Sequence, residues 1–475
     1  MELIFHSIEA YQVALKAGTT SCEEAVAHYL TAIKQQKDLN AYLRVYGDEA
    51  LETARQLDRR RKAGEPMGKL HGVVIGIKDV IAYKGHGLTA ASRILGNYIS
   101  IYNATAVEKL LAEEAIIIGA LNCDEFAMGS SNENSAFGNV LNARDKDRVP
   151  GGSSGGSAVA VQAGLCMISL GSDTGGSVRQ PADFCGILGL KPTYGRVSRY
   201  GLIAYASSFD VIGIFGTTVA DVASVLEVIS GEDEFDSTVK RGDMPLNSIQ
   251  RDNRNYRIAY FKEALEHPGL DPEIQTTILG RLAEWKAAGH TVEAIDFEFL
   301  DYIVPAYYVL TTAEASSNLA RFDGVRYGYR TPVPNLELTE FYKRTRSQGF
   351  GKEVQRRILL GTFVLSAGYY DAYFTKAQQV RQLVVERTEL IFKDFDIIIL
   401  PTAPSTAWRI GEKTDDPISM YLADIYTVYA NLTGIPGISL PLFVHTNGMP
   451  FGLQAMTSRF NEVNLLQFSH QMMQQ

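Results

Sequence analysis

The sequence has 475 residues, of which 46% are hydrophobic and 21% charged, and its 45 Lys and Arg against 54 Asp and Glu give a net charge of −9. This length and composition can bury a large core, which excludes a disordered or fibrous chain. The acidic balance lacks the basic field with which a nucleic-acid binder neutralises phosphates. Any nucleic acid is therefore expected to be held mostly by a partner.

We expect neither a membrane span nor an export signal. The most apolar stretches, such as residues 115–121 and 397–400, fall far short of the roughly 20 residues that cross a bilayer. The N-terminus has no basic region followed by an apolar core. The cysteines form no CxxC pair, which disfavours a zinc knuckle and a disulfide scaffold; they are Cys22, Cys123, Cys166 and Cys185. A reducing cytoplasm is the expected setting.

In chain order, helical patterns fill the first 65 residues, where Ser21 and Glu24 form a capping box sequence. From residue 70, short apolar runs alternate with helical periods. We predict strands at 71–78, 116–119, 167–170 and near Ile258 and Val292, and helices at 105–114, 155–163 and 271–288. This alternation predicts an α/β fold with a mostly parallel or mixed sheet. The polar stretch 231–255 is expected to be a surface excursion of one large domain, and a domain boundary is the alternative.

Glycine is enriched, with 42 residues or about 9% against a typical ~7%, and many of these glycines lie in two motifs. Residues 149–157 read VPGGSSGGS, and residues 171–181 read GSDTGGSVRQP. Such glycine density lets backbone N–H groups crowd around one point, as in an anion or oxyanion cradle. A pair of tight turns or a flexible linker is the alternative. Strong apolar segments on both sides of each motif argue against a linker.

Three kinds of enzyme site are compatible with these motifs to different degrees. A phosphate-binding loop of the form GxxxxGK[ST] is disfavoured because neither motif has the lysine. Residues 151–155 satisfy the GxSxG pattern of a hydrolase elbow, but that site needs a later histidine as base. No later histidine stands out among His267, His290, His445 and His470. The third site would use Lys78 as the base.

Lys78 ends an apolar run, VVIGIK, so its side chain is expected to be at least partly buried. The alternative is a lysine that reaches water or pairs with Asp79. To accept a proton near pH 7, its pKa must fall from ~10.4 by about 3 units, or roughly 4 kcal/mol, which burial can supply. Serine and neutral lysine then make a working nucleophile and base.

These residues resemble the signature of the amidase signature family. The resemblance is carried by Lys78, by GSSGGS at 152–157, by DTGGSVRQP at 173–181 and by the 24-residue step from Ser153 to Ser177. It continues through segments at 122–131, 189–201, 361–373 and 420–427. It implies one large domain, with a mixed central sheet covered by helices on both faces. A helical segment 1–65 and a signature core at about 66–215 would be completed by residues 216–475.

The resemblance also implies the roles of the site residues. Ser177 would be the nucleophile, and Ser153, reached through a cis peptide bond, would relay the proton between Ser177 and Lys78. The oxyanion hole would consist of the backbone N–H groups of Thr174, Gly175, Gly176 and Ser177, because side chains at the glycines would block the substrate carbonyl.

Family positions that bind glutamine match three residues of this chain: Arg357 for the carboxylate, Asp424 for the ammonium group and Tyr308 as a weaker third. The sequence leaves open which of Arg356 and Arg357 points inward, although we favour Arg357. Asp210 and Arg179 are expected to support the site rather than to react.

Within the family, the resemblance implies the glutaminase subunit of a tRNA-dependent amidotransferase. Ammonia would pass to a B subunit that holds the tRNA and uses ATP and Mg²⁺, while a C subunit stabilises the pair; no cofactor or metal is expected on this chain. The alternatives are a stand-alone amidase acting on a small amide, which needs no amino-acid clamp, and a catalytically silent scaffold, which needs no Lys78, Ser153 or Ser177.

Overall fold

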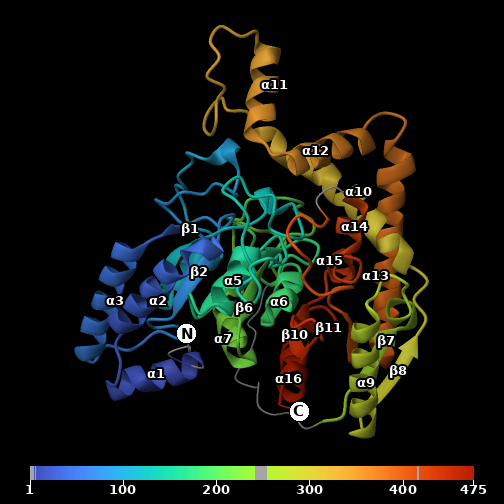
Figure 1. The fold of residues 1–475 in the computed structure, drawn as a ribbon, viewed down its shortest axis with the longest axis horizontal. Coiled ribbons are helices and arrows are strands. Elements are labelled where there is room, and N and C mark those ends of the chain that lie inside the picture. Colours follow the sequence, from blue (N-terminus) through green and yellow to red (C-terminus); the bar gives the residue numbers. More distant parts are fainter. Residues whose placement is uncertain (1–4, 6, 241–253, 414–416, 475) are drawn as a thin grey trace.

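The computed structural model describes residues 5, 7–240, 254–413 and 417–474 (Figure 1). Its centre is a mixed sheet of eleven strands among these residues, in the order β1-β3-β2-β4-β6-β5-β10-β11-β9-β7-β8. The strands are β1 (Tyr42–Val45), β2 (Val74–Lys78), β3 (Ile116–Leu121), β4 (Ile168–Asp173), β5 (Leu188–Lys191), β6 (Val211–Gly216), β7 (Arg257–Phe261), β8 (Thr291–Ile295), β9 (Ile397–Pro401), β10 (Gly437–Val444) and β11 (Pro450–Met456).

Helices surround the sheet. They are α1 (Ile8–Ala17), α2 (Cys22–Gln35), α3 (Gly47–Lys62), α4 (Thr105–Ala112), α5 (Gly155–Gln162), α6 (Arg179–Cys185), α7 (Val219–Ile229), α8 (Lys262–Leu265), α9 (Pro272–Ala287), α10 (Leu300–Asn318), α11 (Leu338–Gly349), α12 (Lys352–Val364), α13 (Lys376–Asp394), α14 (Pro417–Leu422), α15 (Val428–Thr433) and α16 (Glu462–Met472). Shorter 3₁₀ turns lie at Lys37–Leu39, Arg93–Leu95, Glu125–Ala127 and Leu319–Arg321, and a π-helical segment lies at Asp371–Thr375. None of the helices described is both long and apolar enough to serve as a transmembrane span.

The sheet contains two parallel blocks joined by antiparallel strands. Strand β2 runs parallel to β3 and β4, and β7 runs parallel to β8 and β9, whereas the strands between these blocks pair antiparallel. The mixed sheet predicted from the sequence is thus confirmed. Because β2 and β4 are parallel neighbours, their last residues, Lys78 and Asp173, end at the same edge of the sheet.

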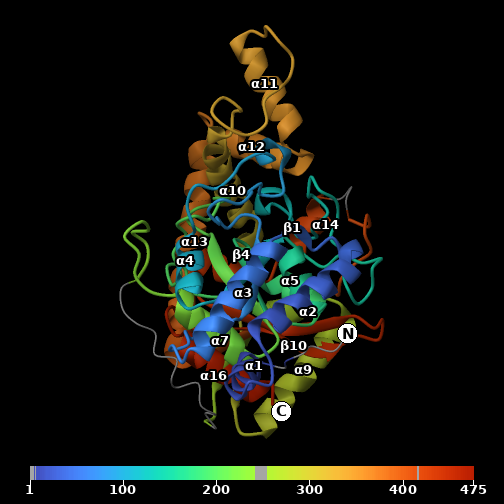
Figure 2. The ribbon, with the colours of Figure 1, turned by 90° about the vertical axis from the view of Figure 1, so that its left-hand side faces the viewer.

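Both faces of the sheet are buried, as predicted. Along β2, Ile75 and Ile77 belong to one hydrophobic cluster, while Val74 belongs to another. The alternation follows from the period of two in a strand. The second cluster gathers α1, α2, α3 and α5, and the first gathers helices such as α4, α7 and α10. Figure 2, turned by 90°, shows α2, α3 and α5 lying over one side of the sheet.

Most predicted elements are present, with shifted ends. The Ser21 hydroxyl accepts the Glu24 N–H at 3.1 Å, and the Glu24 carboxylate accepts the Ser21 N–H at 3.0 Å, so the capping box is confirmed. The strand predicted at 71–78 begins only at Val74, since Gly72 adopts a left-handed turn with φ +73°. Of the polar stretch 231–255, residues 241–253 lie outside the described residues. The subdivision at residues 65 and 215 stays a prediction.

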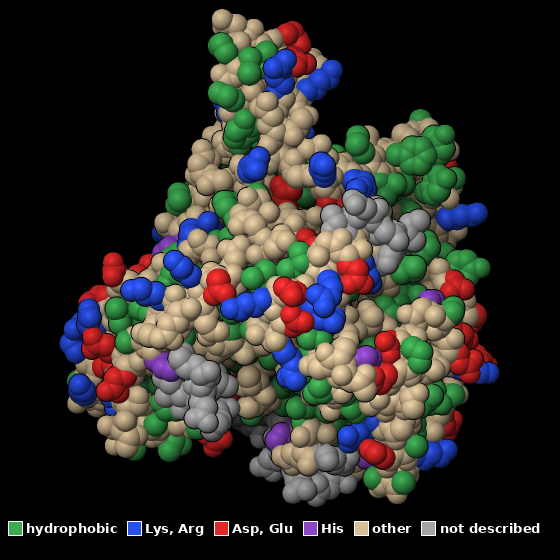
Figure 3. Space-filling model, viewed as in Figure 1, with side chains coloured by type: hydrophobic (Ala, Val, Ile, Leu, Met, Phe, Trp, Pro, Cys, Tyr) green, Lys and Arg blue, Asp and Glu red, His purple; other side chains and the backbone are tan. Residues whose placement is uncertain are grey.

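On the face seen in Figure 3, Lys and Arg side chains are interspersed with Asp and Glu, and hydrophobic side chains gather at the corner between α12 and α13. Exposed residues of this corner include Leu359, Phe363, Tyr369 and Tyr373. Among the residues described on this face, Lys and Arg therefore form no continuous basic stripe.

Candidate active site

Lys78, the last residue of β2, is fully buried beneath the glycine and serine motifs. Its Nζ lies 2.7 Å from Ser153 Oγ, 2.9 Å from Ser154 Oγ and 2.9 Å from Ser172 Oγ. Burial lowers the pKa of Lys78 to about 8, although nearby carboxylates including Asp124 oppose the effect. A lysine with this pKa is partly neutral near pH 7 and can accept a proton.

The Gly152–Ser153 peptide bond is cis, as the family resemblance implied. The loop that carries it is held from two sides: the Gly152 N–H donates to Gln180 Oε1 at 2.9 Å, and the Asp124 N–H donates to the Ser153 carbonyl at 3.0 Å. A Cβ atom at Gly152 would lie 2.2 Å from Asp124 Oδ2, so only glycine fits there. This packing fixes the Ser153 hydroxyl against Lys78.

Ser177 lies on the turn between β4 and α6, and its side chain reaches the edge of the buried site with 9% of the residue exposed. Among the described residues, no hydrogen bond occupies the Ser177 hydroxyl. The Ser154 N–H donates to the Ser177 carbonyl at 3.3 Å, which joins the two serine loops. The structure thus places Lys78, Ser153 and the backbone of Ser177 in one region, and their catalytic roles stay a prediction.

Asp173, at the end of β4, organises the Ser177 loop. Its carboxylate accepts the N–H groups of Gly176 at 2.9 Å and Val178 at 3.1 Å. The Arg179 guanidinium binds both of its oxygens, at 3.1 and 3.2 Å. Burial alone would raise the pKa of Asp173, but the charge and hydrogen bonds of Arg179 lower it to about 2. Asp173 therefore stays ionised, and Arg179 supports the loop rather than facing a substrate.

The Gly176 N–H is already engaged by Asp173, whereas no hydrogen bond occupies the N–H groups of Gly175 and Ser177 among the residues described. Close packing leaves no room for a side chain at either Gly175 or Gly176. A Cβ at Gly175 would lie 2.3 Å from Tyr307 Oη, and one at Gly176 would lie 2.2 Å from Thr427 Oγ1 at φ +126°. The loop can therefore present unoccupied donors to a developing oxyanion, although the composition of the oxyanion hole stays a prediction.

Asp210 lies beside this loop as a support. It accepts the Thr174 hydroxyl at 2.6 Å and the Tyr205 N–H at 3.0 Å. Burial raises the pKa of Asp210 to about 7. Its hydrogen bonds go to protein groups, as expected for a residue that positions Thr174.

Arg357 points inward from α12. Its Nε donates to Glu353 Oε1 at 2.8 Å and its Nη1 donates to Tyr205 Oη at 2.8 Å. The guanidinium carbon lies 5.4 to 5.7 Å from the ring centres of three tyrosines, Tyr205, Tyr308 and Tyr421. Only 4% of the Arg357 side chain is exposed, against 49% for Arg356. The structure therefore places Arg357, and not Arg356, among the buried aromatic rings.

Asp424 also contacts Tyr308. Its Oδ2 accepts hydrogen bonds from Ser130 Oγ at 2.7 Å and Tyr308 Oη at 3.2 Å. Burial raises the pKa of Asp424 to about 7, while Ser130 and the charge of Arg357 oppose this rise. Tyr308 thus contacts both the predicted anion-binding arginine and the predicted cation-binding carboxylate.

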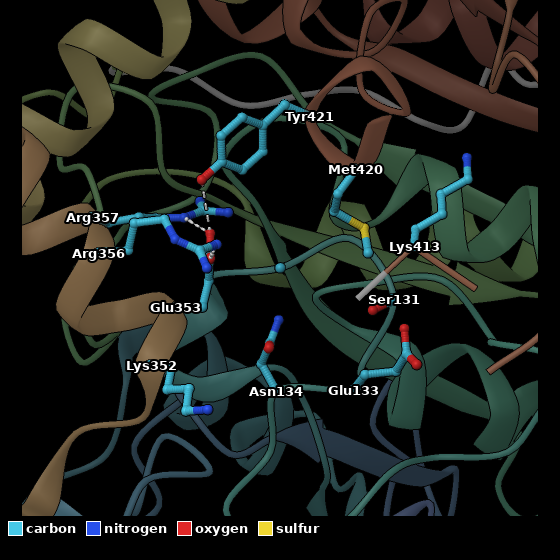
Figure 4. Close-up of a pocket in the computed structure, with 11 residues that line it drawn as sticks. Ser131, Glu133, Asn134, Lys352, Glu353, Arg356, Arg357, Lys413, Met420 and Tyr421 are labelled. Atoms are coloured by element: carbon cyan, nitrogen blue, oxygen red, sulfur yellow. Dashed lines mark hydrogen bonds and ion pairs between the residues drawn. The ribbon is translucent and has the colours of Figure 1, made fainter. Parts of the chain in front are cut away.

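A cavity of about 270 Å³ opens beside Arg357 (Figure 4). It is lined by Gly129, Ser131, Glu133, Asn134, Lys352, Glu353, Arg356, Arg357, Lys413, Met420 and Tyr421. In Figure 4 the two arginines and Tyr421 converge on Glu353, whose Oε1 accepts the Tyr421 hydroxyl at 3.2 Å. Thr427, three residues after Asp424, contacts the Ser177 loop, because its hydroxyl donates to the Gly175 carbonyl at 2.7 Å.

Sequence reasoning did not single out several residues of the site, namely Ser130, Ser154, Ser172, Tyr205, Glu353 and Tyr421. For Glu353 a signal was present, because it precedes Arg357 by four residues on a helix, the spacing of an ion pair. Within the part of the chain that the structure describes, His, Cys, Asp and Glu side chains form no group that could hold a metal ion.

Residues 24–466 match the family described as Amidase. The chain belongs to the amidase family. Several relatives of this amidase are named as the A subunit of glutamyl-tRNA(Gln) amidotransferase. One from Chlorobium phaeobacteroides is 50% identical over 467 residues, covering 97% of each chain, and one from Koribacter versatilis is 48% identical, covering 99% of this chain and 98% of its own.

Solved amidase structures share the fold. The crystal structure of the glutamyl-tRNA(Gln) amidotransferase A subunit from Thermotoga maritima has 39% identity and a TM-score of 0.79, covering 95% of this amidase and 91% of its own chain. The native peptide amidase from Stenotrophomonas maltophilia has 27% identity and a TM-score of 0.82, covering 99% and 97%. The α/β fold predicted for this amidase is therefore confirmed.

Proposed function

We propose that this chain is the glutaminase subunit of a glutamyl-tRNA(Gln) amidotransferase. The observation that carries the proposal is the buried pair of Arg357 and Asp424, which both contact Tyr308. A guanidinium suits a carboxylate and an aspartate suits an ammonium group, so the pair matches the two charges of a free amino acid. A stand-alone amidase acting on a small amide needs no such clamp. The names of the relatives support the same choice.

The proposed reaction begins when Ser177 Oγ attacks the side-chain carboxamide carbon of glutamine. Its proton passes to Ser153, whose own proton passes to Lys78 Nζ across the 2.7 Å hydrogen bond. The oxyanion of the tetrahedral intermediate would be stabilised by N–H groups of this loop such as those of Gly175 and Ser177, since the Gly176 N–H donates to Asp173. When the C–N bond breaks, Lys78 returns the proton through Ser153 and ammonia leaves. Water then attacks the γ-glutamyl ester by the same route, releasing glutamate and restoring Ser177.

Ammonia is the useful product in this proposal. A B subunit would bind Glu-tRNA(Gln) and use ATP and Mg²⁺ to activate its glutamyl carboxylate, and a C subunit would stabilise the assembly in the cytoplasm. The chain's net charge of −9 suits a protein that leaves tRNA mostly to its partner.

The test is Ser177→Ala in the assembled complex. We expect hydrolysis of glutamine to fall to background while amidation of Glu-tRNA(Gln) with added ammonium chloride continues, because the variant removes only the nucleophile. Ser157→Ala is a matched control, since Ser157 is a buried serine on α5 whose hydroxyl donates to the Leu170 carbonyl. Full glutamine hydrolysis by Ser177→Ala would contradict the proposal. Release of ammonia from small amides but not from glutamine by the unmodified complex would indicate a stand-alone amidase instead.

A further inference from the structure

The proposed mechanism uses one serine hydroxyl that is hydrogen-bonded to Lys78 Nζ, but the structure places three such hydroxyls around this atom. Nζ lies within 2.9 Å of Ser153, Ser154 and Ser172. A neutral amine has two N–H donors and one lone pair, so at most one of these hydroxyls can donate to it. Proton transfer from Ser153 requires that the lone pair point to Ser153. The orientation of the amine therefore depends on the other two serines.

Ser154 can act only as an acceptor toward Lys78. Its hydroxyl proton is donated to the Ser172 carbonyl at 3.1 Å, and a carbonyl cannot donate in return. Its oxygen accepts the Ser172 N–H at 3.3 Å and the Lys78 Nζ at 2.9 Å. A hydroxyl has one donor and two acceptor positions, so Ser154 is saturated. One N–H of Lys78 is thereby assigned to Ser154.

The surrounding backbone holds Ser154 in place for its hydrogen bond with Lys78. A Cβ at Gly171 would lie 2.8 Å from Ser154 Oγ, so the glycine on β4 leaves the space that the hydroxyl fills. The Ser154 N–H is held by the Ser177 carbonyl at 3.3 Å. Ser172, next to Gly171 on the same strand, is buried, and within the described residues its hydroxyl has Lys78 Nζ as its hydrogen-bond partner.

We propose that Ser154 and Ser172 are positioning residues, which accept the two N–H groups of neutral Lys78 and so direct its lone pair to Ser153. This inference rests on the proposed function, in which Lys78 is the base. After proton transfer, the ammonium group has three N–H donors, and Ser153, Ser154 and Ser172 accept all three. The same cradle therefore serves both protonation states without rearrangement. If either serine is lost, the amine can rotate about its Cε–Nζ bond and the lone pair is no longer fixed.

The experiment compares Ser154→Ala and Ser172→Ala with the unmodified chain in its assembled complex. Ser157→Ala is the matched control, because Ser157 is buried close by on α5 and donates to the Leu170 carbonyl at 3.1 Å, as Ser154 donates to that of Ser172. Two readouts are taken against pH: steady-state glutamine hydrolysis, and inactivation by phenylmethylsulfonyl fluoride. In the second, the Ser177 Oγ–S bond forms, fluoride leaves, and the Ser177 proton passes through Ser153 to Lys78. This readout needs no glutamine.

We expect kcat to fall about 10-fold or more in both variants, a part of the ~10² to 10⁴ that a general base contributes, with KM for glutamine nearly unchanged. Inactivation should slow similarly. The pH midpoint of both readouts should move lower, because a buried ammonium group that loses an acceptor is destabilised more than the neutral amine. Ser157→Ala should match the unmodified chain in all of these quantities.

Unchanged rates and pH midpoints in both variants would overturn the inference. Slower rates without any change of pH midpoint would also overturn it, because they would indicate a structural effect that does not act through Lys78. Thermal unfolding of each variant establishes that it is folded, and if Ser154→Ala does not fold, Ser172→Ala decides. If the unmodified complex is inactivated by the sulfonyl fluoride but does not hydrolyse glutamine, the proposed function fails, while the inactivation data still decide the role of the two serines.

Discussion

The buried Lys78 should make the stability of the protein depend on pH in a defined direction. Burial lowers its pKa from 10.5 to about 8 in the folded chain, while the unfolded chain keeps the ordinary value. Between these values the unfolded state binds more protons than the folded state. The free energy of unfolding must then rise with pH across this window, and at pH 7 the protein bears the full cost of the buried amine.

The fall from 10.5 to about 8 corresponds to about 3 kcal/mol at ~1.36 kcal/mol for each pH unit. Lys78→Met removes the titrating group and keeps a side chain of similar length. Between pH 7 and pH 10 we expect the unmodified protein to gain about 2 to 3 kcal/mol in unfolding free energy relative to Lys78→Met. Other groups titrate in both proteins, so their effects cancel in the comparison.

Urea unfolding of both proteins at pH 7 and pH 10 measures this difference. The companion measurement is kcat/KM for glutamine hydrolysis, which should rise with pH around a midpoint near 8 in the unmodified complex and fall by ~10² to 10⁴ in Lys78→Met. A stability difference that is the same at both pH values, or one that changes in the opposite direction, would refute the assignment of Lys78 as a lysine neutralised by burial.

Further predictions concern the glutamine pocket and the Ser177 loop. Arg357→Lys should raise KM for glutamine at least about 10-fold because the guanidinium fork is lost, whereas Arg356→Lys should not; equal effects would refute the inward placement of Arg357. Because the pKa of Asp424 is about 7, KM should increase as pH falls below 7, and Asp424→Asn should remove that dependence in a pH series. Gly175→Ala should lower kcat about 100-fold or more, because its Cβ would lie 2.3 Å from Tyr307 Oη. Gly280→Ala, where nothing lies within 4 Å, should instead raise stability by up to ~1 kcal/mol in thermal unfolding.

The sequence predicted those parts of the molecule that depend on local pattern. Strand β2 and its terminal Lys78 follow from an apolar run with a single charge, and the capping box at Ser21 follows from two residues three positions apart. The signature motifs also located Ser153 and Ser177. These features need little knowledge of distant contacts.

Contacts between distant segments were beyond sequence reasoning. The choice between Arg356 and Arg357 depends on how α12 is rotated against α10, which determines which side chain meets Tyr308. Ser172 reads as an ordinary strand residue until β4 is placed beside β2, where its hydroxyl reaches Lys78. Similarly, nothing in the local sequence indicates that the Tyr205 hydroxyl holds the Arg357 guanidinium.

The hydrogen bonds of Arg179 link the Ser177 loop to residues that are synthesised much later than the loop itself. Its guanidinium, which grips Asp173, is itself held by Asn431 and Gln454, each at 2.7 Å. Arg179 precedes these partners by 252 and 275 positions, so both are synthesised long after the Ser177 loop. A partly synthesised chain can thus contain Lys78, Ser153 and Ser177 but lack the two side chains that hold Arg179 against Asp173 in the Ser177 loop. We therefore expect a chain that lacks Asn431 and Gln454 to hydrolyse glutamine poorly, because Arg179 then loses the two side chains that hold it.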